Sequence, residues 1–86
     1  MGGSEPLIVD VRTPEEFQQG AVPEAVNIPM DDLGMHADSL GEKDREITVY
    51  CASGARSAYA ARMLQQMGFS NVQNGGGLMD MMMRQR

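Results

Sequence analysis

Cysteine and histidine are nearly absent from this chain, which has one of each among its 86 residues. The single cysteine, Cys51, excludes an internal disulfide. The single histidine, His36, has no cysteine or carboxylate at the spacing that builds a zinc site. We therefore expect no bound metal and no cofactor, and we interpret His36 as an exposed loop residue without a catalytic role.

Positive charge is also scarce, with 7 Lys and Arg residues against 12 Asp and Glu residues and a formal net charge of -5. The basic residues are scattered along the chain, which argues against nucleic acid as a partner. No apolar run is long enough to span a membrane, so no membrane association is expected. The opening Met1-Gly2-Gly3-Ser4 could replace a removed signal peptide. The compartment would then be periplasmic, whereas a chain that is native as written would be cytoplasmic.

Aromatic residues are few, with no tryptophan, 2 tyrosines and 2 phenylalanines, whereas there are 9 methionines. We therefore expect a core that unbranched methionine side chains fill in part. A chain of this length is near the size at which about 60% of the unfolded surface can be buried. The sequence predicts one monomeric domain over residues 1–86, with a flexible start at residues 1–5.

Strand-like and helix-like segments alternate along the chain. Four β-rich runs predict strands, at residues 7–11, 26–28, 47–50 and 69–73. Helices are predicted at residues 13–20 and 57–67, and residues 30–35 predict a turn or two of helix. The polar stretch 37–46 is expected to be a surface connection. The alternation predicts an α/β fold with a small, open, mainly parallel sheet and helices on both faces.

Capping residues mark the start of the first helix. The Thr13 hydroxyl can accept a hydrogen bond from the N–H of Glu16, whose carboxylate can accept one from the N–H of Thr13, and proline is favoured at the first helical position. Asp10 and Arg12 come just before this cap, at the end of the first strand, and are expected to pair with each other. We interpret this pair as structural support and not as a catalytic group.

The lone cysteine lies between the predicted strand at 47–50 and the predicted helix at 57–67. A run of small residues, Ala52-Ser53-Gly54-Ala55, follows it. Such a loop can curl so that its N–H groups form a nest for an anion, and the positive end of the next helix adds to that field. Both effects lower the pKa of a thiol. Cys51 is therefore a candidate nucleophile, and Arg56 could hold its thiolate or clamp an anionic substrate.

Four motifs of the chain resemble those of single-domain rhodaneses, in the order of that family. Cys51-Ala52-Ser53-Gly54-Ala55-Arg56-Ser57 is similar to the family's Cys-x-x-Gly-x-Arg-Ser loop. The other three motifs are Asp10-Val11-Arg12-Thr13-Pro14-Glu15-Glu16-Phe17, Val22-Pro23-Glu24-Ala25-Val26-Asn27-Ile28-Pro29 and Gly75-Gly76-Gly77-Leu78. The chain most resembles the small, bacterial phage shock protein E type, although Ala21 stands where many members have histidine and Glu24 where glycine is usual.

The resemblance implies a thiosulfate sulfurtransferase. In that family the cysteine attacks the outer sulfur of thiosulfate or of another sulfane-sulfur donor, expels sulfite and carries a persulfide. Cyanide or a thiol, including that of a thioredoxin-like dithiol protein, then removes the sulfur. The resemblance makes Cys51 the catalytic residue and assigns substrate binding to Ala52, Ser53, Gly54, Ala55, Arg56 and Ser57.

Two alternative functions would use the same loop. A cysteine-dependent phosphatase or arsenate reductase carries five residues between its cysteine and its arginine to surround a tetrahedral oxyanion. Here the intervening run is the four residues 52–55, and this smaller ring favours a sulfur atom. A non-enzymatic rhodanese-like binding module would present the loop to a protein partner, but such modules often lack the cysteine.

The glycine run and the methionine-rich end are interpreted as structural. Gly75-Gly76-Gly77 lacks the spacing of a dinucleotide-binding loop and predicts a tight turn that brings the last segment near Cys51. The methionines at positions 79, 81, 82 and 83 have no partner ligands for copper, so helix packing or a frayed tail is favoured.

Overall fold

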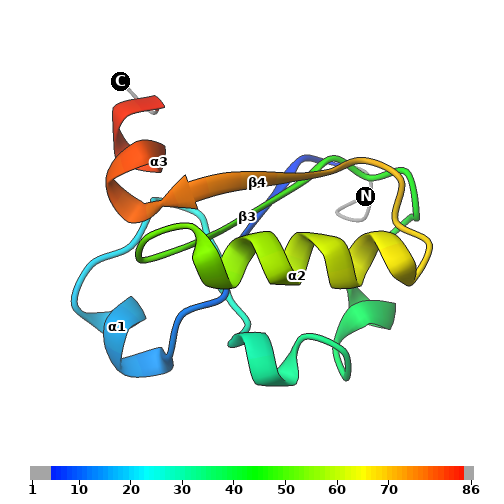
Figure 1. The fold of residues 1–86 in the computed structure, drawn as a ribbon, viewed down its shortest axis with the longest axis horizontal. Helices are drawn as coiled ribbons and strands as arrows, with labels where there is room; N and C mark the ends of the chain where they lie inside the picture. Colours follow the sequence, from blue (N-terminus) through cyan, green and yellow to red (C-terminus); the bar gives the residue numbers. More distant parts are fainter. Residues whose placement is uncertain (1–4, 85–86) are drawn as a thin grey trace.

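A computed structural model describes residues 5–84 and shows strands and helices arranged around one sheet (Figure 1). The strands are β1 (Leu7–Asp10), β2 (Val26–Asn27), β3 (Ile47–Cys51) and β4 (Val72–Gly77). The α-helices are α1 (Pro14–Gln18), α2 (Ala55–Gln66) and α3 (Leu78–Arg84). Two short 3-10 helices, η2 (Met30–Asp32) and η3 (Ala37–Leu40), lie between β2 and β3 in the chain. Most of the expected flexible start, residues 1–4, lies outside the described residues.

The sheet is parallel throughout, with the strand order β2-β1-β3-β4. Parallel strands end at the same edge of a sheet, so the segments that follow β1 and β3 meet there. α2 covers one face of the sheet and α3 packs on the other face, as the ribbon shows (Figure 1). The predicted α/β fold with helices on both faces is confirmed.

The larger core lies between the sheet and α2. Ala60, Ala61 and Leu64 lie at spacings of three and four on one face of α2 and are buried in this core. Met67, the last residue of the predicted helix, follows the end of α2 and is 38% exposed. Cys51 belongs to this core and has no exposed surface. Its side chain therefore lies on the α2 side of the sheet.

A smaller apolar cluster on the opposite face contains Val22, Tyr50 and Met81. Met81 is the one buried methionine among those of residues 5–84, and Met35 and Met79 are 79% and 71% exposed. Methionine therefore fills only part of the core, as expected, since two other methionines are partly buried against the larger cluster. Valine, isoleucine, leucine and alanine from the strands and α2 make up most of the core, and α3 turns only one side of its methionine run toward the sheet.

The fourth strand occupies a different segment from the predicted one. β4 extends to Gly77 and does not cover residues 69–71, so the glycine run is part of a strand and not a tight turn. Glycine is needed because a Cβ on Gly77 would collide with the carbonyl oxygen of Ala52. The run itself lies beside Cys51, since Gly77 pairs with Cys51 in the sheet.

The expected surface connection over residues 37–46 is wrong at its beginning. η3 forms there and buries Ala37 and Leu40 in the larger core. Residues three positions apart lie on the same side of a 3-10 helix, so these two apolar side chains face the core together. The rest of the stretch is exposed or half-buried, and His36 is exposed, as predicted.

A buried ion pair fixes the carboxyl end of β1. Nη2 of Arg12 lies 2.7 Å from Oδ2 of Asp10, and Nη2 also donates to the carbonyl oxygen of Gly20 at 2.7 Å. The Tyr50 hydroxyl donates to Oδ2 of Asp10 at 2.7 Å and accepts from the N–H of Val22 at 3.0 Å. The predicted pairing of Asp10 with Arg12 is confirmed. The group ties β1, β3 and the segment at residues 20–22 to one another.

Glu24 has a backbone conformation that favours glycine. Its φ is 71°, in the left-handed region, where a side chain costs about 1–2 kcal/mol. Among residues 5–84 it is the one residue other than glycine with a positive φ. The glycine that is usual at this place in the rhodaneses it resembles would relieve that strain.

Replacing Tyr50 by phenylalanine is expected to lower the free energy of unfolding by about 1–3 kcal/mol, because the buried N–H of Val22 then loses its acceptor. Urea denaturation followed by circular dichroism measures the change. Tyr59→Phe is the matched control, since Tyr59 is 63% exposed and its hydroxyl can bond to water. Equal effects of the two substitutions would show that the Tyr50 hydroxyl does not stabilise the fold.

Candidate active site

Cys51 is the last residue of β3, at the edge of the sheet where the parallel strands end. α2 begins at Ala55 and not at the predicted residue 57, because Gly54 is its N-cap. Arg56 and Ser57 therefore lie in the first turn of the helix. The motif is thus built from a strand end, a short link and a helix start.

Hydrogen-bonding groups of the loop surround the sulfur of Cys51. The backbone nitrogens of Gly54 and Ser57 lie 3.0 and 3.4 Å from Sγ, and Oγ of Ser57 lies 3.5 Å from it. Burial raises the pKa of the thiol, but the hydrogen bonds of Ser57, Gly54 and Ser53 together outweigh burial and lower the pKa below its ordinary value. The predicted nest of N–H groups is thus present around Sγ.

Gly54 makes this arrangement possible. Its φ of 103° is one that residues with a Cβ rarely adopt, and its N–H donates to Sγ. Its carbonyl oxygen accepts from the N–H of Ala58 in α2. The glycine of the Cys-x-x-Gly-x-Arg spacing is therefore a conformational requirement of the turn.

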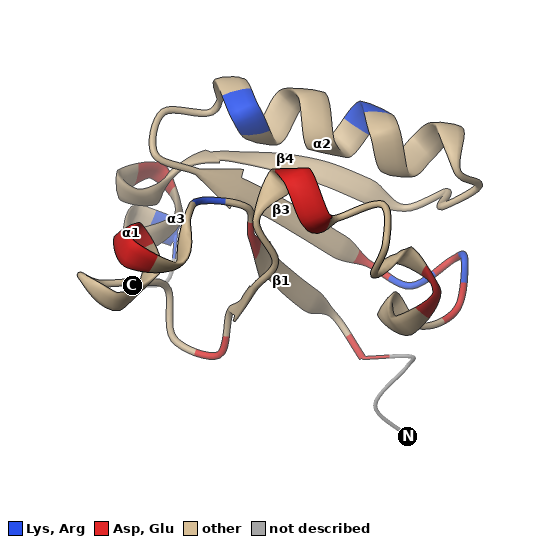
Figure 2. Ribbon diagram, turned by 90° about the horizontal axis from the view of Figure 1, so that it is seen from below, with Lys and Arg blue, Asp and Glu red and all other residues tan. Residues whose placement is uncertain are grey.

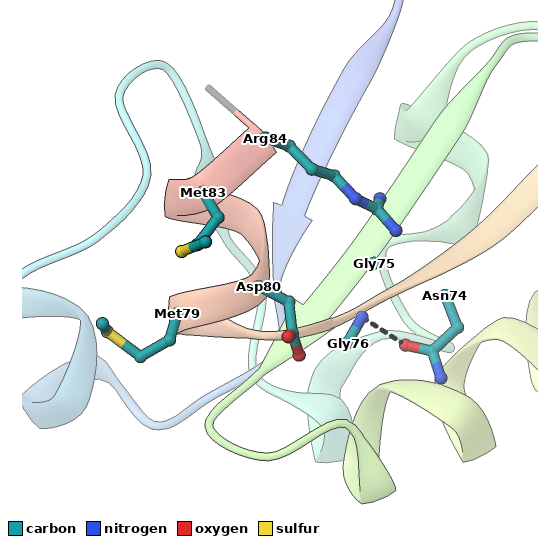
Figure 3. A pocket seen from close by; sticks show the side chains of 7 residues that line it. All are labelled: Asn74, Gly75, Gly76, Met79, Asp80, Met83 and Arg84. Carbon is teal, nitrogen blue, oxygen red and sulfur yellow. Dashed lines mark hydrogen bonds between the residues drawn. The ribbon is translucent and has the colours of Figure 1, made fainter. Parts of the chain in front are cut away.

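Asn74, in β4, joins the start of α2 to the edge strand. Its Oδ1 lies 2.6 Å from Oγ of Ser57, and its Nδ2 donates to the carbonyl oxygen of Gly54 at 3.3 Å. The N–H of Gly76 donates to the same Oδ1 at 2.9 Å, as the dashed line in Figure 3 shows. Sequence analysis missed Asn74, because no motif spacing relates it to the cysteine and it was expected to precede a turn.

Arg56 pairs with Glu16, the capping residue of α1. Nη1 and Nη2 of Arg56 each lie 3.0 Å from one carboxylate oxygen of Glu16. The hydrogen bonds from Arg56 and from the N–H of Thr13 hold the pKa of Glu16 at about 2. The predicted capping box of Thr13 and Glu16 is confirmed. Sequence analysis missed the second role of Glu16, which is to compensate the charge of Arg56.

Arg56 does not touch the sulfur. Among the hydrogen bonds of residues 5–84, none joins Arg56 to Cys51, so its charge acts on the thiolate through space. The side chain of Arg56 is 37% exposed, which leaves its guanidinium accessible to a dissolved anion. A small cavity of about 90 Å³ adjoins it, lined by Val11, Thr13, Pro29, Met30, Asp31 and Arg56.

A larger hollow of about 440 Å³ lies between β4 and α3. Its lining residues, shown in Figure 3, are Asn74, Gly75, Gly76, Met79, Asp80, Met83 and Arg84. Asp80 accepts from the N–H of Gly77 at 2.9 Å and so connects α3 to the end of β4. Cys51 does not line this hollow, which places it outside the nest around the sulfur.

In the part of the chain that the structure describes, no three side chains of His, Cys, Asp or Glu gather as a metal site could require. None of the helices between residues 5 and 84 has the length and apolar character needed to cross a membrane. Figure 2 shows the Lys and Arg residues of the described part of the chain on separate helices and loops.

Comparisons with known proteins agree with these features. A family model described as the rhodanese-like domain matches residues 1–80. The chain is 40% identical over 76 residues to the thiosulfate sulfurtransferase PspE of Escherichia coli, and the matched region covers 87% of this chain and 73% of PspE. It is 43% identical over 68 residues to a sulfurtransferase of Allochromatium vinosum, and the matched region covers 79% of this chain and 63% of that sulfurtransferase.

The fold gives the same result. A solved structure of a rhodanese with anions from E. coli has a TM-score of 0.83 to this chain and 38% sequence identity, covering 87% of this chain and 89% of the other. The parallel sheet, the loop after β3 and the matched sequence therefore lead to one conclusion. The chain belongs to the rhodanese-like family.

Proposed function

We propose that this protein is a sulfurtransferase that carries sulfane sulfur on Cys51 as a persulfide. The observation that carries the proposal is the buried sulfur at the end of β3, to which the backbone N–H groups of Gly54 and Ser57 both point. These groups can stabilise a thiolate, and the same field can stabilise the charged outer sulfur of a persulfide. The family and the sulfurtransferase activity named for two relatives support the proposal.

The proposed reaction has two steps. The Cys51 thiolate attacks the outer sulfur of thiosulfate, the sulfur–sulfur bond of thiosulfate breaks, and sulfite leaves with the electron pair. The product is a Cys51 persulfide anion. In the second step an acceptor attacks the outer sulfur and the Cys51 thiolate leaves, which gives thiocyanate from cyanide or a new persulfide from a thiol. A thioredoxin-like dithiol protein is an acceptor of the second kind.

Substrate binding is assigned to residues 52–57 of the loop. Ala52, Ser53 and Ala55 are exposed, so their backbone can meet an incoming donor. The partly exposed guanidinium of Arg56 can attract thiosulfate, which carries two negative charges. Glu16 neutralises part of the charge of Arg56. Arg56 should therefore bind the departing sulfite less tightly than an unpaired arginine would.

The first prediction is that Cys51 is the sole sulfur carrier. Incubation of the protein with thiosulfate should add the mass of one sulfur atom, which cyanide should remove as thiocyanate. Cys51→Ser should show neither the mass increase nor thiocyanate formation. An unchanged mass of the wild-type protein, with its thiol shown to be free, would rule out the sulfurtransferase and would favour a non-enzymatic binding module.

The second prediction concerns the size of the loop. Hydrolysis of an aryl phosphate should stay at background, because the four residues 52–55 form a ring suited to a sulfur atom and not to a tetrahedral oxyanion. Insertion of one glycine between Ala55 and Arg56 should weaken thiosulfate turnover. Phosphatase activity of the unmodified protein would contradict the proposal and support the phosphatase alternative.

The third prediction is that Arg56 acts on the anionic states of the reaction. Arg56→Ala should raise the pKa of Cys51 and reduce turnover by roughly ten- to a thousandfold, on the order of 1.4 to 4 kcal/mol of lost stabilisation, and Arg56→Lys should recover part of it. Iodoacetamide reactivity against pH measures the thiol, and Arg62→Ala on the same helix is the control for lost charge. An unchanged titration midpoint with unchanged turnover would assign Arg56 a structural role only.

A further inference from the structure

The hydroxyl of Ser57 has more acceptors within reach than it has protons. Its Oγ lies 2.6 Å from Oδ1 of Asn74, 3.1 Å from the carbonyl oxygen of Gly54 and 3.3 Å from that of Gly76. The fourth neighbour is Sγ of Cys51, at 3.5 Å. A hydroxyl donates a single hydrogen bond, so the sulfur and the three oxygens compete for one proton.

The orientation of the Asn74 amide decides this competition while the thiol is protonated. The N–H of Gly76 donates to the Asn74 amide, so the amide atom that faces it is the acceptor Oδ1, and Nδ2 then faces the carbonyl oxygen of Gly54. Oδ1 is therefore also the atom that faces Ser57, and the amide cannot donate to the hydroxyl. The short contact of 2.6 Å makes Asn74 the preferred acceptor of the Ser57 proton.

Ionisation of the thiol reverses the preference. A protonated Cys51 can donate its own S–H to Oγ of Ser57, and Ser57 then donates to Asn74. The thiolate has no proton to donate, and as an anion it is the stronger acceptor. The hydroxyl can then turn its proton from Oδ1 to Sγ, and Asn74 keeps the hydrogen bond from the N–H of Gly76. Neither position of the proton leaves a buried donor without an acceptor.

We infer that Asn74 is a positioning residue that holds the Ser57 hydroxyl proton while Cys51 is a thiol and releases it to the sulfur when Cys51 is an anion. The inference deepens the proposed function and rests on it for its bearing on turnover. The neutrality of the amide is essential, because a carboxylate at position 74 would form a charge-assisted bond to the hydroxyl and keep its proton.

Charged groups lie near the loop on α1, α2 and α3, and Arg84 of α3 lines the same hollow as Asn74 (Figure 3). Arg56 of α2 is bound to Glu16 of α1, and Asp80 of α3 accepts from the N–H of Gly77. On the opposite face of the sheet, Asp10 and Arg12 form their own ion pair. A change of charge at position 74 is therefore the main electrostatic change that the test introduces near the sulfur.

The test is the pH dependence of Cys51 alkylation by iodoacetamide, which reports this thiol alone because the chain has one cysteine. Asn74→Asp should raise the titration midpoint of Cys51 by about one pH unit. In a protein that also carries Ser57→Ala, the hydroxyl is absent and only the added charge acts, so the same substitution should raise the midpoint by less than half as much. Gln73→Glu is the matched control, since it makes the same amide-to-acid change at an exposed neighbouring position of β4. It should leave the midpoint unchanged.

Asn74→Ala gives a test of opposite sign. This substitution removes the acceptor that stabilises the thiol state and leaves the thiolate state its bond from Ser57, so the midpoint should fall. Melting curves show whether each variant is folded. If Asn74→Asp does not fold, the midpoint of Asn74→Ala alone tests the inference. Equal shifts for Asn74→Asp in both backgrounds, or a midpoint that does not fall in Asn74→Ala, would overturn the inference. Because alkylation needs no turnover, the result is independent of whether thiosulfate is the donor.

Discussion

The hydroxyl of Tyr50 fixes the end of the central strand, and the position of the sulfur depends on it. Tyr50 donates to the buried carboxylate of Asp10 and accepts from the N–H of Val22, while Arg12 neutralises the carboxylate. Successive residues of a strand point to opposite faces. Anchoring Tyr50 on one face therefore sets the direction of Cys51 on the other. A buried ion pair is costly unless it is fully hydrogen-bonded, and this one is bonded to three separate segments.

Mostly neutral groups provide the field around the sulfur. Backbone N–H groups of Gly54 and Ser57 contact Sγ. Arg56, the cationic residue of the motif, is bound to Glu16 instead. Neutral donors held by the backbone stabilise an anion without a second buried charge that would itself need compensation. The loop can thus lower the pKa of a buried thiol even though burial alone would raise it.

The errors of the sequence analysis have a common physical origin. Local patterns describe what one segment prefers, whereas the edge strand and the core depend on contacts between distant segments. Gly77 is glycine because the backbone of Ala52 lies against it, and the run was mistaken for a turn because glycine favours turns when such a contact is unknown. The methionines near the chain end were expected to pack as a helix or to fray, and their pattern alone did not show that Met81 is the one buried against the sheet.

The sequence by itself determined the class of fold, the capping box and the loop that carries Cys51. Each of these is encoded in neighbouring residues, since hydrophobic periodicity, caps and tight turns act over a few positions. Only the tertiary structure decided that Glu16 binds Arg56 and that Asn74 reaches Ser57. These pairs are far apart in the chain and have no shared spacing. Parallel strands that end at one edge bring them together, and that juxtaposition arises only when the sheet forms.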